Sequence, residues 1–347
     1  MNERVFPTLP ERMENTEELE DVMTTPSSEL TADLAGVEGD ILILGVGGKM
    51  GPTLARMAKR AAPQKRVIGV ARFSDSNLRS RLEDQGVECI KCDLTDSGTV
   101  QLLPHIDNVV FMAGHKFGAS DNAAHTWAIN AGVPYVVADV FRESRIVVFS
   151  TACVYPYVDI GGPGASEETL TQPPPGDYAM SCVARERIFQ FGSQRYGTAG
   201  RLVRLSYAID LRYGVLLDVA TSVRTERPVD VTMGYVNVIW QGDANEQALR
   251  LLAQCTSPTS PINVSGWEKV GIRWLAAQFG ERFDKPPNVI GDEAETAWLV
   301  DTSAARQLFG TPRISLNTMI DWVADWVMHD RPSLGKKTHF ETRDGKY

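Results

Sequence analysis

A turn of glycines between a buried strand and a helix constrains the fold most. The stretch DILILGVG is a continuous apolar run that ends in glycines, which is typical of a strand buried on both faces. It leads into Gly45-x-x-Gly48-x-x-Gly51, and the following PTLARMAKRAA has helical spacing. Such glycines allow a tight turn, a close backbone approach to a pyrophosphate and close packing of helix on sheet. The helix N-terminus adds amides and a partial positive charge, so we predict dinucleotide binding rather than a merely structural turn.

Strands and helices alternate after this turn. RVIGVAR, VECIKCDL, NVVFMAG and RIVVFST are typical of further buried strands, and helical stretches such as NLRSRLEDQG separate them. This alternation predicts an α/β protein with a Rossmann-type, doubly wound parallel sheet. Residues 208–235 are expected to hold loops and short elements, whereas SLNTMIDWVADWVMHD predicts a long amphipathic helix. The second half therefore predicts a smaller C-terminal α/β lobe packed against the first domain.

The predicted organisation has four parts. They are an acidic N-terminal arm (1–38), a dinucleotide-binding domain (39–205, with 236–256 returning to it), a substrate-binding lobe (206–330) and a C-terminal tail (331–347). Residues 1–40 hold eleven acidic and two basic side chains, which accounts for the whole net charge of −9. We interpret the arm as a solubility or partner-contact appendage whose deletion leaves cofactor binding intact. The tail is expected to be loose surface.

Composition and charge exclude several classes of protein. The chain beyond the arm has equal numbers of acids and bases, so it lacks the surplus of Lys and Arg that nucleic-acid binding needs. No apolar run approaches the roughly 18 residues of a membrane span. The acidic N-terminus lacks the apolar segment of a signal peptide. Five dispersed cysteines predict neither a disulfide framework nor a metal site. We expect a cytoplasmic protein that binds no metal, membrane or nucleic acid.

The end of the second predicted strand bears on which nicotinamide cofactor is bound. An NAD site usually places a carboxylate there for the ribose hydroxyls, but this chain has Ala71 followed by Arg72. With no acid to repel a 2′-phosphate and a guanidinium able to grip it, NADP is predicted, with NAD as the alternative. The competing interpretation of Arg72 is a solvated arginine that stacks on adenine.

Several segments within roughly residues 41–328 resemble the extended short-chain dehydrogenase/reductase family, also known as the NAD-dependent epimerase/dehydratase family. The glycine loop matches, Asp93-Leu94 resembles the pair beside the adenine, and Ala113-Gly114 with Lys116 is similar to the segment under the nicotinamide. The strand ending in Thr151 and the segment Tyr178-Ala179-Met180-Ser181 resemble the two catalytic motifs. Together with Arg72, the resemblance implies these cofactor-binding residues: Gly45, Gly48, Lys49, Met50, Gly51, Arg72, Asp93, Leu94, Ala113, Gly114, Lys116 and Tyr178.

The resemblance implies that Thr151 and Tyr178 are catalytic. A hydride passes between nicotinamide and a carbinol carbon, while the tyrosine takes or returns the hydroxyl proton and Thr151 polarises the substrate oxygen. The expected protein is an NAD(P)-dependent oxidoreductase or epimerase acting on a carbohydrate. A homodimer is expected because family members often pair.

One departure from the family pattern concerns the lysine that normally follows the tyrosine by four residues. Here that position is Cys182. The lysine lowers the pKa of the tyrosine and holds the nicotinamide ribose. Arg185, Lys116 or the charge of oxidised nicotinamide could compensate. The alternative function is therefore a catalytically impaired dinucleotide- or sugar-binding member of the same fold.

A second departure concerns the substrate side. Arg204-Leu205-Ser206-Tyr207 lacks the family's asparagine that contacts sugar nucleotides, and no paired arginines for a diphosphate are evident. These gaps favour a smaller substrate, such as a free sugar, sugar acid or glycoside. Asp210 and Arg212 are expected either to contact the sugar or to form an internal salt bridge.

Overall fold

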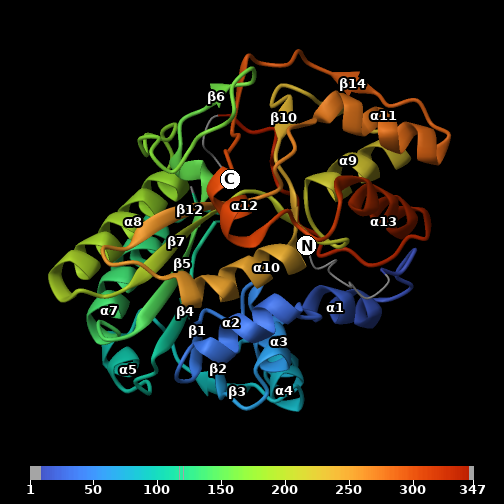
Figure 1. The fold of residues 1–347 in the computed structure, drawn as a ribbon. Coiled ribbons are helices and arrows are strands. Elements are labelled where there is room, and N and C mark those ends of the chain that lie inside the picture. Colours follow the sequence, from blue (N-terminus) through green and yellow to red (C-terminus); the bar gives the residue numbers. More distant parts are fainter. Residues whose placement is uncertain (1–8, 117, 120, 344–347) are drawn as a thin grey trace.

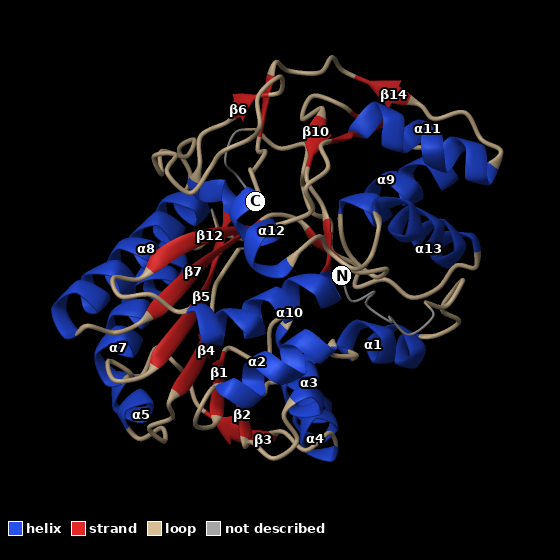
Figure 2. Cartoon of the chain, in the orientation of Figure 1, coloured by secondary structure: helices blue, strands red, loops and turns tan. Residues whose placement is uncertain are grey.

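A seven-stranded parallel sheet forms the centre of the structure, a computed structural model that describes residues 9–116, 118–119 and 121–343 (Figures 1 and 2). Its strand order is β12-β7-β5-β4-β1-β2-β3, and every neighbouring pair is parallel. The strands are β1 (Ile41–Leu44), β2 (Val67–Ala71), β3 (Glu88–Lys91), β4 (Asn108–Phe111), β5 (Arg145–Thr151), β7 (Gly200–Leu205) and β12 (Ser260–Val264). The predicted α/β Rossmann-type fold is confirmed.

Helices cover both faces of this sheet, and the strand sequences require it. All four residues of β1 are buried; Ile41 and Ile43 belong to one core, while Leu42 and Leu44 belong to the core on the opposite face. Helices α3 and α10 lie on the first face, and α7 and α8 on the second (Figure 2). The helices of this domain are α3 (Gly51–Ala61), α4 (Ser76–Asp84), α5 (Ser97–Gln101), α6 (Ala123–Trp127), α7 (Val133–Val140), α8 (Asp177–Tyr196) and α10 (Gln241–Arg250). A π-helical turn, Ala128–Gly132, joins α6 to α7.

The second lobe is built around three helices that pack on one another. They are α9 (Val215–Arg224), α11 (Ile272–Phe283) and α13 (Leu316–Met328), and they share one hydrophobic core. The remaining short strands form four pairs: β8 (Ala208–Ile209) with β11 (Ile239–Trp240), β9 (Val229–Asp230) with β14 (Val289–Ile290), β10 (Tyr235–Val236) with β13 (Val270–Gly271), and β6 (Val158–Asp159) with β15 (Thr296–Ala297). Helix α12 (Ser303–Phe309) packs instead on β12, and its buried residues belong to the core of the sheet. The ten-residue α9 lies where only loops and short elements were expected. Its β-branched residues have low helix propensity, and burial of one face against α11 and α13 overrides that propensity.

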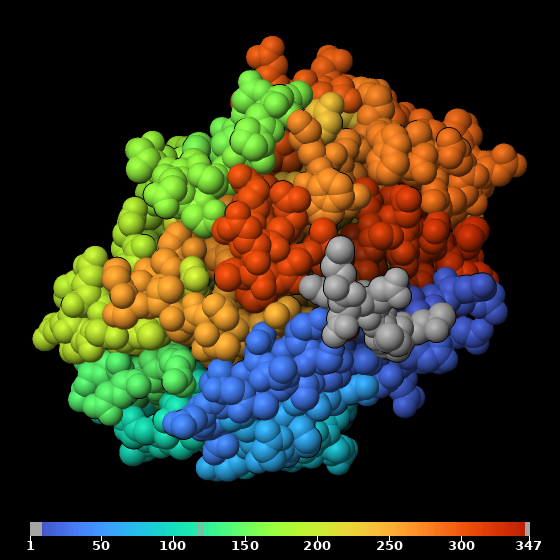
Figure 3. Space-filling model, in the orientation of Figure 1, coloured from blue at the N-terminus to red at the C-terminus, as the bar shows by residue number. Residues whose placement is uncertain are grey.

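The described part of the N-terminal arm, from residue 9, is folded onto the body. Its helices α1 (Thr16–Thr24) and α2 (Ser28–Gly36) are capped by the side chains of Asn15 and Ser27. Leu19 and Met23 of α1 belong to the core of the second lobe, while Leu30 and Leu34 of α2 belong to the core of the sheet. Figure 3 shows the arm, in blue, continuous with the surface of both parts. The expected appendage is therefore a structural element that joins the two cores.

The described part of the C-terminal tail, up to residue 343, is also docked. Phe340 is buried in the core of the second lobe, and Thr338 donates hydrogen bonds to Asp218. The expectation of loose surface is wrong for this stretch, because an apolar side chain and a paired hydroxyl hold it down. Residues 344–347 of the predicted tail and 1–8 of the predicted arm lie outside the described residues.

Candidate active site

The glycine loop after β1 has the shape that phosphate binding needs. Gly45 has φ +91°, and a side chain there would put its Cβ 2.6 Å from the backbone nitrogen of Ala113. At Gly51, the first residue of α3, a Cβ would lie 2.2 Å from the carbonyl oxygen of Val46. Only glycine fits either place without displacing backbone. The loop is thereby left open for a ligand at the N-terminus of α3, where the amides point outward.

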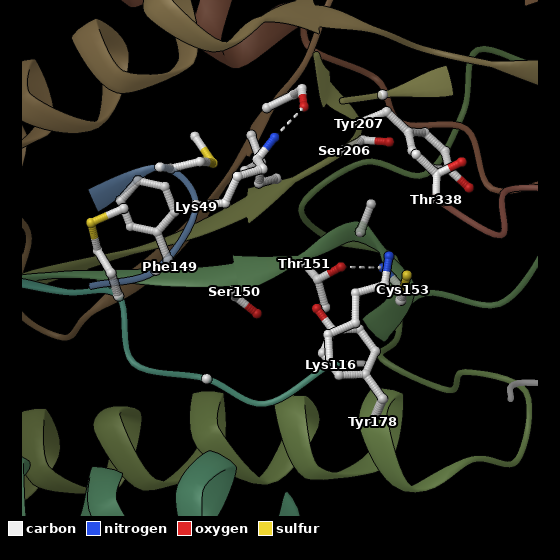
Figure 4. A pocket seen from close by; sticks show the side chains of 18 of the residues that line it. Lys49, Lys116, Phe149, Ser150, Thr151, Cys153, Tyr178, Ser206, Tyr207 and Thr338 are labelled. Atoms are coloured by element: carbon white, nitrogen blue, oxygen red, sulfur yellow. Dashed lines mark hydrogen bonds between the residues drawn. The ribbon is translucent and has the colours of Figure 1, made fainter. Parts of the chain in front are cut away.

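Two cavities meet at this loop. The Arg72 cavity has a volume of about 390 Å³ and extends over the ends of β2 and β3. The Tyr178 cavity has a volume of about 300 Å³ and lies over the end of β5 and the start of α8 (Figure 4). Gly45, Gly48 and Gly114 line both cavities. An extended ligand such as a dinucleotide fits this pair of cavities, with its phosphates at the loop and its two halves on either side.

Every residue predicted from the sequence to be catalytic or to bind the cofactor lies on one of these two cavities. The Arg72 cavity takes Arg72, Asp93, Leu94 and Ala113, and the Tyr178 cavity takes Lys49, Met50, Gly51, Lys116, Thr151 and Tyr178, besides the shared glycines. The structure thus brings the predicted set together, and their individual roles stay predictions. Within the described residues, no group of three or more His, Cys, Asp and Glu side chains is arranged to hold a metal ion.

Charged groups of both signs line the Arg72 cavity. Arg72 is exposed at the end of β2. Asp93 accepts hydrogen bonds from the backbone nitrogen and hydroxyl of Thr95, which lower its pKa, and the charge of Arg72 lowers it further. Asp75 lies on the same wall, where it caps α4 by accepting from the backbone nitrogen of Asn77. The lining of this cavity therefore includes one guanidinium, that of Arg72, and two carboxylates, those of Asp75 and Asp93.

Thr151 and Tyr178 face each other in the Tyr178 cavity (Figure 4). Thr151 is the last residue of β5, and its hydroxyl oxygen accepts a hydrogen bond of 3.2 Å from the backbone nitrogen of Cys153. Tyr178 lies in the first turn of α8. Burial raises the pKa of Tyr178 well above its usual value, and the thiols of Cys182 and Cys153 add to this.

Two groups act in the opposite direction on Tyr178. The charge of Arg185 and a hydrogen bond with Thr151 lower the pKa of the phenol, although burial outweighs both. A threonine hydroxyl beside a tyrosine hydroxyl is an arrangement that can hold one substrate oxygen between them. The chemistry that this pair supports is proton transfer at a carbinol or carbonyl group.

The family model for the NAD dependent epimerase/dehydratase family matches residues 41–209, from β1 to β8. The match includes the glycine loop, Thr151 and Tyr178. These residues belong to the NAD-dependent epimerase/dehydratase family. We call the segment the epimerase/dehydratase domain. No curated protein sequence matches the chain.

Solved structures of other proteins share the fold at low sequence identity. Epimerase Mth375 from Methanothermobacter thermautotrophicus is 16% identical with a TM-score of 0.71, over 87% of this chain and 96% of that one. WbmG from Bordetella bronchiseptica, in complex with NAD and UDP, is 18% identical with a TM-score of 0.70, over 88% and 98%. UDP-glucose 4-epimerase from Thermotoga maritima, with UDP-glucose, is 15% identical with a TM-score of 0.69, over 84% and 99%. The similarity covers both lobes and concerns the fold alone.

Position 182 of the epimerase/dehydratase domain is closed off from solvent. Cys182 is fully buried and packs with Ala152, Val154 and Val300 in a small apolar cluster. Burial raises the pKa of its thiol to about 11. The thiol is therefore protonated at neutral pH, which does not suit a nucleophile.

Two cationic side chains lie near the buried cysteine. Arg185 donates to the carbonyl oxygen of Phe149 (2.9 Å) and to Oδ1 of Asn130 (2.6 Å), and it is not among the residues that line the Tyr178 cavity. Lys116 does line the cavity, and its Nζ lies 6.0 Å from the centroid of the Tyr178 ring. Burial lowers the pKa of Lys116. Arg185 is thus buried behind the wall of the Tyr178 cavity, whereas Lys116 forms part of that wall.

A buried polar network fixes the strand that carries Thr151. Glu186 of α8 pairs with Arg204 of β7 at 2.8 Å, and both side chains are almost completely buried. Glu186 also accepts from the hydroxyl of Ser150 (2.7 Å), and Arg204 donates to the hydroxyl of Tyr155 (2.7 Å). Removing one partner of such a pair leaves an uncompensated buried charge. Arg204 therefore has a structural part in this domain.

The far wall of the Tyr178 cavity comes from the second lobe and the tail. Lys49 of the glycine loop donates to the carbonyl oxygen of Ala208 (3.1 Å), and its Nζ lies 4.2 Å from the centroid of the Tyr213 ring. Burial lowers the pKa of Lys49 to about 8.

Asp210 and Arg212 form a salt bridge of 2.8 Å, and neither residue lines the cavity. Of the two interpretations of this pair, sugar contact or internal salt bridge, the structure has the internal salt bridge.

Among the residues of this wall that sequence reasoning missed are Tyr207, Trp298 and Thr338. They lie in loops far apart along the chain, and no local pattern marks them. Only the packing of the second lobe and the tail brings them to one cavity.

Proposed function

We propose that this protein is an NAD(P)-dependent oxidoreductase or epimerase that acts on a carbohydrate. The observation that carries the proposal is the Thr151–Tyr178 pair, which lies in a cavity continuous with the glycine loop of an epimerase/dehydratase domain. A bound nicotinamide would supply the hydride acceptor or donor, and Gly48, Met50 and Gly51 would hold its phosphates. NAD and sugar nucleotides in the solved structures of similar fold support the substrate class.

Tyr178 is proposed to move the proton. Its phenolate oxygen accepts the proton of a substrate hydroxyl as the carbon loses its hydride, and returns it in the reverse step. The Thr151 hydroxyl donates to the same substrate oxygen and stabilises negative charge on it. Because burial raises the pKa of Tyr178, a cation must act on it before it can serve as a base at neutral pH.

The two tasks of the missing lysine are proposed to be divided between Arg185 and Lys116. Arg185 is permanently charged and lowers the pKa of Tyr178 from behind, but its hydrogen bonds hold it out of the cavity. Lys116 lies at the cavity surface near the Tyr178 ring, where an ammonium group can contact a nicotinamide ribose. The loop after β4 thus supplies the ammonium that α8 lacks.

A rescue experiment tests this division. We expect Lys116→Met to lower kcat/KM by about a hundredfold, the lower range for loss of a group in proton transfer. Adding Cys182→Lys to that variant restores the ammonium at the family's usual position and recovers at least part of the rate. Cys182→Met in the same background has similar length but no charge and is expected to recover nothing. Full activity in Lys116→Met alone would contradict the proposed division.

NADP is proposed as the cofactor because Arg72 lies in the open end of the Arg72 cavity. We expect Arg72→Gln to raise the Kd for NADP⁺ by about tenfold, the value of one charge-assisted contact, and to change the Kd for NAD⁺ by less than about twofold. Isothermal titration calorimetry with both dinucleotides measures this. Equal weakening of both would assign Arg72 to adenine stacking instead.

The substrate is proposed to be a small carbohydrate rather than a nucleotide-diphosphate sugar. The Tyr178 cavity, at about 300 Å³, lies at the lower end of the range for small-molecule sites and must also admit a nicotinamide ring. Of the described residues that line it, the charged ones are Lys49 and Lys116, and no arginine is present for a diphosphate. A free sugar, sugar acid or glycoside fits these walls.

A substrate screen tests the proposed function as a whole. Purified protein with NADP⁺ or NAD⁺ is mixed with sugars, sugar acids and glycosides, and absorbance at 340 nm is followed; sugar products are analysed by mass spectrometry and NMR to detect epimers. Turnover that is lost in Thr151→Val supports the proposal. Dinucleotide binding without any turnover would support the second candidate, an impaired binding protein, which the neutral Cys182 and the raised pKa of Tyr178 favour.

A further inference from the structure

The C-terminal tail follows α13, and its described part, up to Arg343, packs on the second lobe and reaches the Tyr178 cavity. Its first anchor is a hydrogen bond of 2.9 Å from the backbone nitrogen of Leu334 to the carbonyl oxygen of Arg212. Its second is Asp218 of α9, whose Oδ2 accepts from both the backbone nitrogen (2.8 Å) and the hydroxyl (2.6 Å) of Thr338. Burial of Phe340 adds an apolar anchor two residues later.

The far end of the described tail is held by Thr296 of β15 and by Tyr157. The guanidinium of Arg343 donates to the carbonyl oxygen and the hydroxyl of Thr296, each at 2.7 Å, and lies 4.2 Å from the centroid of the Tyr157 ring. Tyr157 in turn packs on Trp298, with ring centroids 4.6 Å apart, and Trp298 lines the Tyr178 cavity. The tail is thus held at both ends against residues that shape the site.

The tail has a cavity on each side. Thr338 lines the Tyr178 cavity, and Figure 4 shows its side chain at the edge of that space, close to Tyr207. A second cavity of about 410 Å³ lies on the other side and is lined by Asp218, Lys337 and Glu341, among others. The hydrogen bonds between Thr338 and Asp218 cross the partition between the two spaces.

We propose that the tail segment 333–343 is the specificity wall of this site and that Thr338 sets the largest substrate it admits. With the wall in place, the Tyr178 cavity ends at Thr338 and accepts a single sugar unit. The second cavity, which has room for a larger substituent such as a nucleotide, stays separated from the reacting atoms. This inference rests on the proposed function for the identity of the substrate, but the partition itself is tested without any substrate.

Alkylation of Cys153 measures access to the cavity, because this half-buried cysteine lines it. Thr338→Trp and Thr338→Leu enlarge the side chain that faces the cavity. We expect each to slow the reaction of Cys153 with N-ethylmaleimide by about tenfold, because a space of this size loses much of its volume to such side chains. Lys337→Trp and Lys337→Leu place the same groups on the other side of the wall and are expected to leave the rate within about twofold of the parent. Peptide mass spectrometry reads the rate, with Cys89 on β3 as an internal reference.

The opposite change tests the size limit. Thr338→Gly removes both the side chain and its hydrogen bond to Asp218, and we expect labelling of Cys153 by fluorescein maleimide, a much bulkier reagent, to rise about tenfold. In the substrate screen the same variant is expected to raise kcat/KM for glycosides relative to free sugars, while Thr338→Leu raises KM with little change in kcat.

The proposal is contradicted if Thr338→Trp and Thr338→Leu both leave the alkylation rate of Cys153 unchanged. The circular dichroism spectrum and the alkylation rate of Cys89 must match the parent, which shows that both variants are folded. If the alkylation results hold and no carbohydrate is turned over, the wall stands and the proposed function fails.

Discussion

We expect Tyr178→Phe to lower kcat by about 10²- to 10⁴-fold, the range for loss of a general acid–base group. The phenyl ring keeps the shape of the cavity wall, so the dinucleotide Kd should change by less than about twofold. Stopped-flow measurement of hydride transfer, with the substrate found by the screen, gives the rate. Fluorescence titration with the dinucleotide gives the Kd.

Thr151→Val is the matched variant for this measurement. It keeps the size of the side chain and removes the hydroxyl that bonds with Tyr178 and accepts from Cys153. A loss of about 10²- to 10³-fold is expected, as for one donor to a developing oxyanion. A Tyr178→Phe enzyme with the parental rate would show that another group moves the proton, and Lys116, in the same cavity, would be the first to examine.

Deletion of residues 1–36 is expected to prevent folding, in contrast to the expectation from sequence that cofactor binding survives it. Five apolar side chains in the described part of this segment are at most 1% exposed: Met13, Leu19, Met23, Leu30 and Leu34. Each is worth about 1.5–3 kcal/mol of burial, or about 8–15 kcal/mol together. This equals the whole free energy of unfolding of a typical domain, about 5–15 kcal/mol. Expression of the shortened chain should give insoluble protein.

A single substitution tests the same point in the full chain. Leu30→Ala should lower the free energy of unfolding by about 2–5 kcal/mol, measured by urea denaturation, because it leaves a hole in the core of the sheet. Glu17→Ala, on the exposed side of α1, is the control and should change it by less than about 0.5 kcal/mol. A soluble deletion variant that still binds the dinucleotide would contradict the structural role of the arm and support its interpretation as a dispensable appendage.

The sequence predicted the sheet correctly, and the residues that it proposed for the cofactor line the two cavities, because both signals are local. A buried strand of a parallel sheet needs apolar residues on both faces, as ILIL of β1 shows, and the glycine loop needs residues without a Cβ at Gly45 and Gly51. Each signal depends on neighbours within a few positions of the chain. The cavities then follow, because the loops after parallel strands all emerge at one edge of the sheet.

The remaining features could not be predicted because they depend on distant partners. Leu19 and Leu30 look like ordinary residues of an acidic stretch until α3 and α10 are placed beside them. Phe340 and Thr338 lie in a polar, basic tail, and only α9 gives them a core and a carboxylate. The composition of both segments is polar and charged, which predicted exposed chain. Their positions are instead fixed by a few apolar side chains that are buried against the body.

The arm also sets the order in which the molecule can be completed during synthesis. Trp322 of α13 donates a hydrogen bond to the carbonyl oxygen of Pro10, a partner 312 residues earlier in the chain. On the ribosome, this hydrogen bond and the packing of Leu19 and Met23 in the core that α13 shares cannot form until α13 has been made. The contacts of α1 and α2 with α3 join nearer segments and do not have to wait for α13, so the arm acquires its native contacts in at least two stages.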